Sequence, residues 1–446
     1  MQPTLTIGDA TIYLGNNLDI LPTLPDNSVD SIVCDPPYEL GFMGKSWDSS
    51  GIAYSVELWQ ECLRVLKHGG HLLAFGGTRT WHRLAVAIED AGFEIRDNIA
   101  WLYGSGFPKS HNISKAIDKA AGAERTVIDV KKFGARLGSI TSGNSQGGET
   151  GGFNYSTEQK VTASATDEAK AWDGWGTALK PAHEPIVVAR KPVIGTVAEN
   201  VLKHGVGGLN IDGTRIGFAE DDKPSAGNRT ATFGTQETKS GGDGSGGYEA
   251  NTVGRWPANI ILDEYTAELL DQQSGISKSP SGVQVRKAGS EFGQNTGWNA
   301  HENKDTLRQG HGDSGGASRF FYVAKANKRD RNEGLDELPE IRHADRNATD
   351  GVGGDNPRNR TNQAKQNFHP TVKPTALMQY LIRLVTPENG VVLDPFTGSG
   401  STGKAAILEN KKFIGIELTA EYLPIIEGRL KHAYKTMTSK EVDLFE

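Results

Sequence analysis

The sequence has few cysteines, no long apolar run and no excess of positive charge. Only Cys34 and Cys62 occur in 446 residues, and their wide spacing excludes a disulfide framework and a CxxC metal site. No stretch of roughly 18 or more apolar residues is present, and no basic segment followed by an apolar one opens the chain. These absences predict a cytoplasmic protein with neither a membrane partner nor a secretory signal.

The apolar content is low as well. Hydrophobic residues make up 36% of the chain, glycines number 55, and the mean hydropathy is −0.47. A chain of this length can still bury a sizeable core. We therefore expect a compact core that carries long polar segments.

The net charge of −7 argues against a protein that coats nucleic acid by charge alone, because phosphate binding needs clustered Lys and Arg. Local basic faces that bind nucleic acid are still possible, although an ordinary solvated surface explains each cluster of Lys and Arg equally well. Two clusters stand out: Lys109, Lys115, Lys119, Arg125, Lys131, Lys132 and Arg136, and then Arg319, Lys325, Lys328, Arg329 and Arg331.

The hydrophobic pattern predicts an α/β fold interrupted by polar segments. Strands are expected at 31–34, 71–75 and 93–101, with helices near 58–66 and 81–91 between them. The same alternation returns near the C-terminus. The predicted organisation is a first core half (1–121), a flexible Gly/Ser-rich insertion (122–171), a core strand segment (172–194), a loop-rich region (195–368) and a second core half (369–446).

The first motif is Asp35-Pro36-Pro37-Tyr38, which follows an apolar strand. The prolines fix an extended backbone, so the Asp35 carboxylate and the Pro36 carbonyl form a pair of acceptors. Such acceptors favour the pyramidal, attacking form of an exocyclic amine, whose lone pair is otherwise delocalised into the base. Tyr38 offers a ring for a base rotated out of a duplex. An ordinary strand-ending turn has the same residue types.

The second motif follows a predicted strand and begins a helix, as in nucleotide-binding folds. An acid about 20 residues later, Glu417, occupies the place where such folds bind ribose hydroxyls. The turn itself consists of Asp394, Pro395, Phe396, Gly398, Ser399 and Gly400. Residues 398–404 also spell the start of a phosphate-binding P-loop, but Ala405 replaces the magnesium ligand, so Lys404 is expected to be a solvated helix residue.

Together, the two motifs resemble the amino-methyltransferases of DNA, and their order resembles the circularly permuted β-class. The resemblance covers roughly 1–120, 172–194 and 369–446. It implies a Rossmann-like core with a mostly parallel sheet, S-adenosylmethionine as cofactor and double-stranded DNA as substrate. Residues 195–368 would then be the target-recognition domain, and a homodimer and a cognate restriction endonuclease become candidate partners.

The resemblance extends to two shorter segments. Residues 368–374 are similar to the family's motif X, which implies that Thr371 or Lys373 meets the carboxylate of the cofactor. A helix start capped by Thr371 is the alternative for that segment. Asn16 stands where the family has an acid that contacts the cofactor's adenine.

By this resemblance the methyl transfer is direct, so no metal, His or Cys is assigned a chemical role. DPPY in place of SPPY favours adenine N6 over cytosine N4 as the target. The other hypotheses are a P-loop NTPase, an inactive DNA-binding protein, and RNA or protein as methyl acceptor. Arg255-Trp256 and the segment 319–322 are candidate base-reading residues, although local core is favoured for their aromatic rings.

Overall fold

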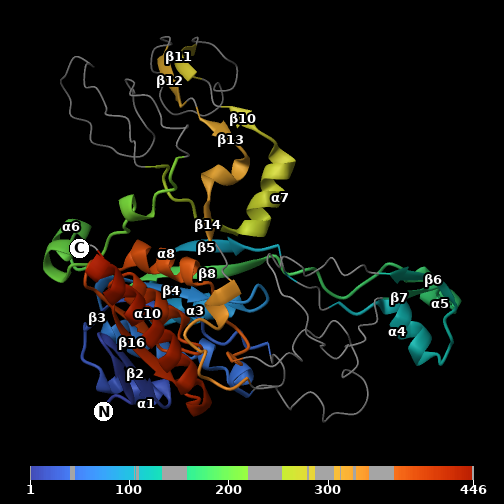
Figure 1. The fold of residues 1–446 in the computed structure, drawn as a ribbon, viewed down its shortest axis with the longest axis horizontal. Helices are drawn as coiled ribbons and strands as arrows, with labels where there is room; N and C mark the ends of the chain where they lie inside the picture. Colours follow the sequence, from blue (N-terminus) through green and yellow to red (C-terminus); the bar gives the residue numbers. More distant parts are fainter. Residues whose placement is uncertain are drawn as a thin grey trace. The chain divides into compact units, whose positions relative to one another are not determined.

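The computed structural model describes residues 2–40, 46–104, 106, 110–132, 158–218, 254–278, 281–286, 306–311, 313–324, 328–340 and 366–443. The chain forms two compact units, which we describe separately (Figure 1). Unit 1 consists of residues 1–104, 183–337 and 369–446, and unit 2 of residues 105–182 and 338–368.

A ten-stranded sheet forms the centre of unit 1, in the order β1-β2-β16-β15-β3-β4-β8-β5-β9-β14. Its strands are β1 (Leu5–Ile7), β2 (Ala10–Leu14), β3 (Val29–Cys34), β4 (Leu66–Phe75), β5 (Glu94–Leu102), β8 (His183–Arg190), β9 (Ile260–Asp263), β14 (Tyr322–Ala324), β15 (Val391–Asp394) and β16 (Lys412–Glu417).

The strand directions explain where a site can form. All neighbouring pairs are parallel except those of β1 with β2 and of β8 with β4 and β5. The last strands of the chain, β15 and β16, lie between β2 and β3. The carboxyl ends of β16, β15, β3 and β4 therefore share one edge, and the amino end of the antiparallel β8 lies at that edge too.

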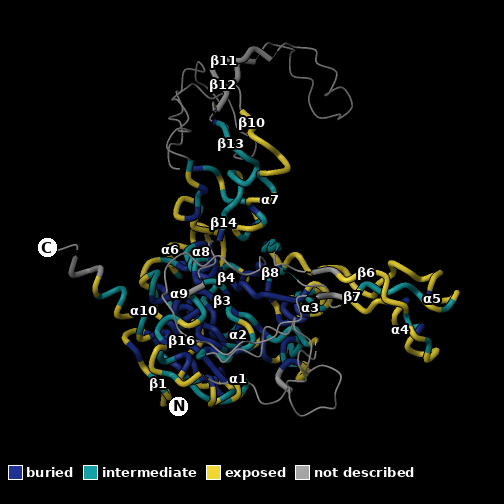
Figure 2. The backbone as a smooth tube through the Cα atoms, turned by 45° about the vertical axis from the view of Figure 1, so that its right-hand side comes forward, coloured by how far each residue is buried: buried dark blue, intermediate teal, exposed yellow. Residues whose placement is uncertain are grey.

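Both faces of the sheet centre are covered. Every residue of β3 is buried, as in strands that have helices on both sides (Figure 2). Alternate residues such as Ile32 and Leu72 join one apolar cluster with α2 and α3. The main helices of unit 1 are α1 (Asn17–Ile20), α2 (Val56–Val65), α3 (Trp81–Asp90), α6 (Val197–His204), α7 (Glu264–Ser274), α8 (Thr375–Val385), α9 (Ser401–Leu408) and α10 (Leu423–Asp443).

Local sequence signals set the bounds of the helices that flank the sheet. Ser55 caps α2 by accepting a hydrogen bond from Leu58 N at 3.3 Å. Gly92, with φ of +105°, turns the chain after α3. Gly400 precedes α9 with φ of +74°, a conformation that favours glycine. The predicted strands and helices of both core halves are therefore present.

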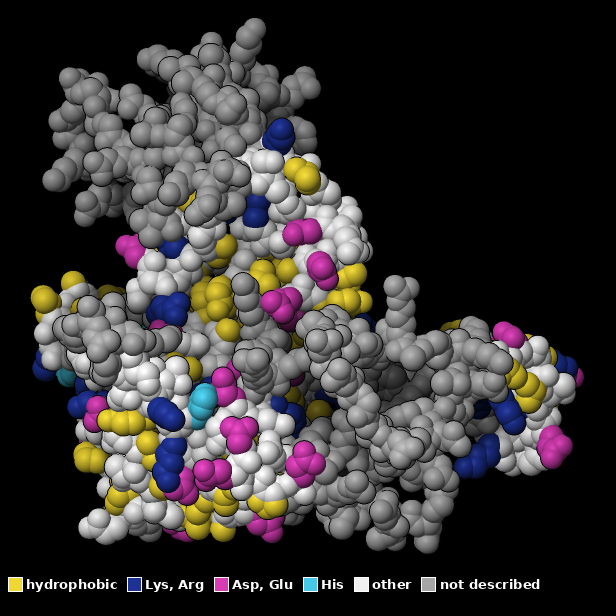
Figure 3. All heavy atoms as spheres, viewed as in Figure 1, with side chains coloured by type: hydrophobic (Ala, Val, Ile, Leu, Met, Phe, Trp, Pro, Cys, Tyr) yellow, Lys and Arg dark blue, Asp and Glu magenta, His cyan; other side chains and the backbone are white. Residues whose placement is uncertain are grey.

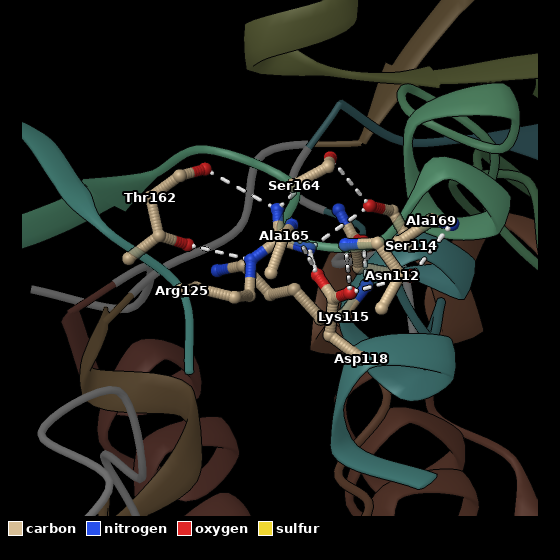
Figure 4. A network of polar contacts seen from close by, with 10 residues as sticks. Asn112, Ser114, Lys115, Asp118, Arg125, Thr162, Ser164, Ala165 and Ala169 are labelled. Carbon is tan, nitrogen blue, oxygen red and sulfur yellow. Dashed lines mark hydrogen bonds and ion pairs between the residues drawn. The ribbon is translucent and has the colours of Figure 1, made fainter. Parts of the chain in front are cut away.

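Unit 2 is held together by a buried ion pair. Its elements are α4 (Ile113–Ala120), β6 (Val127–Lys132), β7 (Glu158–Thr162) and α5 (Asp167–Ala171). The Asp118 carboxylate accepts hydrogen bonds from Arg125 and from the backbone of Ala165 and Thr166 (Figure 4). These bonds outweigh burial and lower the pKa of Asp118 to about 2. Ordered elements thus lie within the segment predicted as a flexible insertion, whose residues 133–157 are outside the described ranges.

The loop-rich region also forms two small two-stranded sheets within its described residues. They pair β10 (Ser277–Lys278) with β13 (Ser314–Gly315) and β11 (Ser281–Arg286) with β12 (Thr306–His311). Among the described residues no helix combines the length and apolar character that a membrane span requires.

The predicted α/β, mostly parallel, Rossmann-like architecture is confirmed.

Candidate active site

Three acidic residues from distant parts of the sequence meet at one edge of the sheet. Asp35 directly follows β3, Asp394 ends β15 and Glu417 ends β16. Because β16, β15 and β3 are neighbours and parallel, the structure brings the two sequence motifs together. Ligands of open α/β sheets bind at such an edge, where strand order reverses.

The segment 35–38 is held in a fixed course. The carbonyl of Tyr38 accepts a hydrogen bond from Thr80 Oγ1 at 2.8 Å, just before α3 begins. Gly77 lies against the Tyr38 side chain, where an added Cβ would come within 3.2 Å of the ring. Pro36 is buried and Pro37 half-buried. The turn is therefore fastened to the end of β4 as well as to β3.

Lys373 lies inside this turn. Its Nζ donates to Asp35 Oδ2 at 2.6 Å and to the Tyr38 hydroxyl at 3.2 Å. Glu184, near the amino end of β8, lies 3.4 Å from Nζ and accepts a hydrogen bond from the Tyr38 hydroxyl at 2.8 Å. Burial acts to lower the pKa of Lys373, but the two carboxylates raise it overall. Thr371 or Lys373 was predicted to meet the cofactor's carboxylate, and in the structure Lys373 Nζ donates to Asp35.

Asp394, the first acid of the second motif, binds residues of the turn that follows it and of the next helix. Asp394 is buried, and its carboxylate accepts hydrogen bonds from Phe396 N at 2.9 Å and from Thr402 Oγ1 at 2.5 Å. Burial raises the pKa of Asp394 to about 7. The Asp394 carboxylate thus holds the turn 395–400 through its hydrogen bonds. Within this turn Pro395 is buried, and the half-buried Phe396 lies beside Trp59.

Glu417 fastens the opposite side of the same turn. Its carboxylate accepts hydrogen bonds from Gly398 N at 2.7 Å and Thr419 N at 2.8 Å. Burial raises the pKa of Glu417. The Thr419 hydroxyl and Leu418 N also hydrogen-bond to this carboxylate. Gly398 itself has φ of +54° and is half-buried, which leaves its backbone accessible.

Two predicted cofactor residues lie behind the turn instead. Ser399 and Gly400 are buried. Arg429, on α10, donates to the Ser399 carbonyl at 2.5 Å and to the hydroxyls of Ser399 and Ser401 at 3.0 and 3.1 Å. Its side chain is fully buried, and burial lowers its pKa to about 10. Sequence reasoning missed Arg429 because an isolated arginine in a helix gives no local signal.

The remaining predicted residues occupy the rim of the same edge. Asn16 is exposed and caps α1 through Leu18 N, while the adjacent Asn17 donates to the Pro395 carbonyl at 3.4 Å. Thr371 is exposed and bonded to the His369 ring through its backbone. Thr371 does not cap α8, which begins at Thr375 after Pro374. The capping alternative is therefore wrong.

Lys404 is buried, contrary to the prediction from the sequence. It was predicted to be a solvated helix residue, but its side chain is 2% exposed. Nζ lies 2.7 Å from Glu333 and 3.6 Å from Asp330. The prediction failed because the acids that pair with it come from a loop 71 residues earlier. The same pairing weakens the P-loop alternative, since the amine is already neutralised.

The two candidate base-reading arginines are bound within the protein. Arg255 Nη2 and Arg319 Nε lie 2.6 and 3.1 Å from one oxygen of the buried Asp313. Both guanidinium groups also lie over the Phe320 ring, at 5.4 and 4.3 Å from its centroid. Trp256 is exposed, contrary to the local-core interpretation of its ring. The guanidinium groups therefore stabilise this region rather than project from it.

The fold and the site define an α/β protein in which three acidic residues and a Gly-rich turn meet at one edge of a mostly parallel sheet. The family model described as DNA methylase, for enzymes of the N6/N4 class, matches residues 29–428. The chain therefore belongs to the N6/N4 DNA methylase family. Family membership also confirms the predicted cofactor, because these enzymes take their methyl group from S-adenosylmethionine.

The sequence similarity to three curated relatives covers part of each chain. The chain is 48% identical over 62 residues to the type II methyltransferase M2.LlaDCHI of Lactococcus lactis subsp. cremoris, covering 14% of this chain and 23% of the relative. It is 45% identical over 76 residues to the DNA adenine methyltransferase YhdJ of Escherichia coli (strain K12), covering 17% and 26%. With M.HindIII of Haemophilus influenzae, identity is 28% over 159 residues, or 35% and 38% of the chains. The chain thus spans well under half the length of these relatives.

The residues at the sheet edge fit a nucleoside-containing methyl donor. The Glu417 carboxylate is of a type that accepts from hydroxyls, the Gly398 backbone is accessible, and Phe396 is half-buried beside them. On the neighbouring strand, Asp35 Oδ1 is buried and has no hydrogen-bond partner among the described residues. An acceptor left in this state is costly unless a ligand donor reaches it.

Proposed function

We propose that this protein transfers a methyl group from S-adenosylmethionine to the exocyclic amine of a base rotated out of double-stranded DNA, with adenine N6 as the favoured target. The observation that carries the proposal is Oδ1 of Asp35, which is buried and has no hydrogen-bond partner among the residues that the structure describes. It lies at the end of β3, beside the Gly-rich turn that follows β15.

The proposed role of segment 35–38 is to hold the amine. Asp35 Oδ1 and the Pro36 carbonyl accept its two hydrogens, which turns the nitrogen lone pair toward the cofactor. Tyr38 offers its ring face to the base, while its hydroxyl is held by Glu184. Holding both reactants in line supplies much of the rate, together with acceptors aimed at the developing charge. The cofactor supplies an electrophilic methyl group on a sulfonium.

Cofactor binding is assigned to the turn and to the acid of the next strand. Glu417 binds the ribose hydroxyls, and Gly398 allows close approach of the backbone. Asp394, Pro395, Ser399 and Gly400 act by shaping the turn. For Asn16 and Thr371, exposed positions at the same edge support a contact at the rim.

The strand order supports assignment to the circularly permuted β-class. The strand that precedes the Gly-rich turn, β15, is late in the chain, yet it lies beside β3, the strand that carries Asp35. The strand that continues the sheet after β16 is β2, near the N-terminus. The core is thus complete only when the two ends of the chain meet.

Contact with the DNA backbone is assigned to a groove in unit 2. The groove has a volume of about 620 Å³. Lys115 and Lys160 lie along it, and neither has an ion-pair partner among the described residues. Basic and apolar side chains lie side by side on the surface of this unit (Figure 3). Unpaired lysines in a groove suit phosphate binding, which does not depend on sequence.

A nucleoside digest tests the proposed function. DNA is incubated with the protein and S-adenosylmethionine labelled in the methyl group, and the labelled nucleosides are separated. N6-methyladenine is the expected product. N4-methylcytosine as the only product would overturn the choice of adenine and leave amine methylation standing, and label recovered only from RNA or protein would overturn the substrate class.

A further inference from the structure

We infer that Lys373 and Glu184 are positioning residues for methyl transfer: together they fix one oxygen of Asp35 and leave the other free for the target amine. The inference rests on the proposed function. It assigns Lys373 a different contact from the prediction that Thr371 or Lys373 meets the cofactor's carboxylate.

The contacts of Lys373 use all its donors. An ammonium group has three hydrogens, and the acceptors around it are Asp35 Oδ2 at 2.6 Å, the Tyr38 hydroxyl at 3.2 Å and Glu184 Oε2 at 3.4 Å. The side chain is 8% exposed. Nζ also lies 4.8 Å from the centroid of the Phe75 ring, a distance that favours a cation. The ammonium is thus held from four sides.

This arrangement gives the two Asp35 oxygens different tasks. Oδ2 is occupied by Lys373, whereas Oδ1 is buried and has no partner within the described part of the chain. A carboxylate that could rotate would present either oxygen, and the geometry of the held amine would vary. Fixing Oδ2 therefore orients Oδ1, and well-oriented groups contribute strongly to rate.

The Lys373 ammonium is itself held in place by its neighbours. Glu184 holds the cation in turn through Tyr38 and by its own charge. The titratable and charged groups around Asp35 are Lys373, Tyr38, Glu184, Cys34, Asp394 and His369. Lys373 is the cation in direct contact with the carboxylate.

Separate measurements of turnover and of cofactor affinity distinguish a positioning role of Lys373 from a cofactor-binding role. We would compare the wild type with Lys373→Met, which removes the charge, and Lys373→Arg, which keeps it. Without the cation, Asp35 Oδ1 is no longer held in one orientation, so kcat for methyl transfer should fall about tenfold or more. The Arg variant should regain most of the lost kcat. The affinity for S-adenosylmethionine, measured calorimetrically without DNA, should change less than about twofold in both.

Two results would overturn the inference. One is a Lys373→Met variant whose kcat is unchanged at saturating cofactor while its cofactor Kd rises about tenfold or more, as expected of a residue that binds the cofactor's carboxylate. The other is a Lys373→Met variant with wild-type kcat and wild-type cofactor affinity. Glu184→Gln provides the same test if Lys373→Met does not fold: a smaller loss of kcat with unchanged cofactor affinity supports the inference, and an unchanged kcat contradicts it. A wild type that methylates no DNA would instead defeat the proposed function.

Discussion

Lys373 Nζ and Asp35 Oδ2 lie 2.6 Å apart, although 338 residues separate them in the sequence. The contact joins the segment that precedes α8 to the end of β3. It shows that the two halves of the core complete one site, because the first half supplies the carboxylate and the second half supplies its cation.

Glu417→Ala should weaken cofactor binding. If the carboxylate binds the ribose hydroxyls and also holds Gly398 N, its removal should raise the Kd for S-adenosylmethionine about tenfold or more, the value of one charged hydrogen bond. Isothermal titration calorimetry measures this Kd directly. Glu388→Ala is the matched control, since Glu388 is exposed and lies before β15, at the opposite end of the strand. Equal affinity in the two variants would remove Glu417 from the cofactor site.

Asp394→Asn should alter the pH dependence of stability. Burial raises the pKa of Asp394 to about 7 in the folded protein, against about 3.9 in an unfolded chain. Between those values the unfolded chain has released a proton that the folded protein retains, so wild-type stability falls as pH rises from about 4 to 7. Above pH 7 the wild type should have lost up to about 4 kcal/mol of unfolding free energy relative to the Asn variant. Denaturant unfolding of both proteins from pH 4 to 7 tests this prediction. Unfolding free energies that change with pH in the same way in both proteins would contradict it.

Lys404→Met tests the P-loop alternative. The variant should lose about 2 kcal/mol of unfolding free energy, because Glu333 loses its buried partner. Its kcat for methyl transfer should stay within about twofold of wild type, and the wild type should not hydrolyse ATP. Lys412→Met, at an exposed position on β16, is the control for removing a lysine. ATP hydrolysis that depends on Lys404 would favour the nucleotidase hypothesis.

Lys115→Glu combined with Lys160→Glu should weaken binding to DNA of any sequence. Removing two phosphate contacts should raise the KM for DNA and reduce the slope of log affinity against log salt by about 2, with kcat and cofactor affinity unchanged. The control pair Lys412→Glu with Lys435→Glu makes the same change of charge at exposed positions of unit 1. If both pairs had the same effect, the groove would have no special role.

The sequence predicted the parts of the site that carry local signals. Apolar runs and Gly-rich turns marked β3 and β15 and placed Asp35, Asp394 and Glu417 at strand ends. It could not predict partners supplied from distant segments. The burial of Lys404 depends on Glu333, and the role of Lys373 depends on Glu184 near the amino end of an antiparallel strand. Neither partner has a motif of its own.

In the proposed reaction Asp35 acts on the amine and not on the cofactor. Methyl transfer and S-adenosylmethionine affinity, measured side by side in Asp35→Ala, test this role. We expect that transfer of labelled methyl groups to DNA is abolished, while the cofactor Kd stays within about threefold of the wild-type value. Near-normal turnover in the variant would contradict it, and so would a loss of activity that is fully explained by lost cofactor binding.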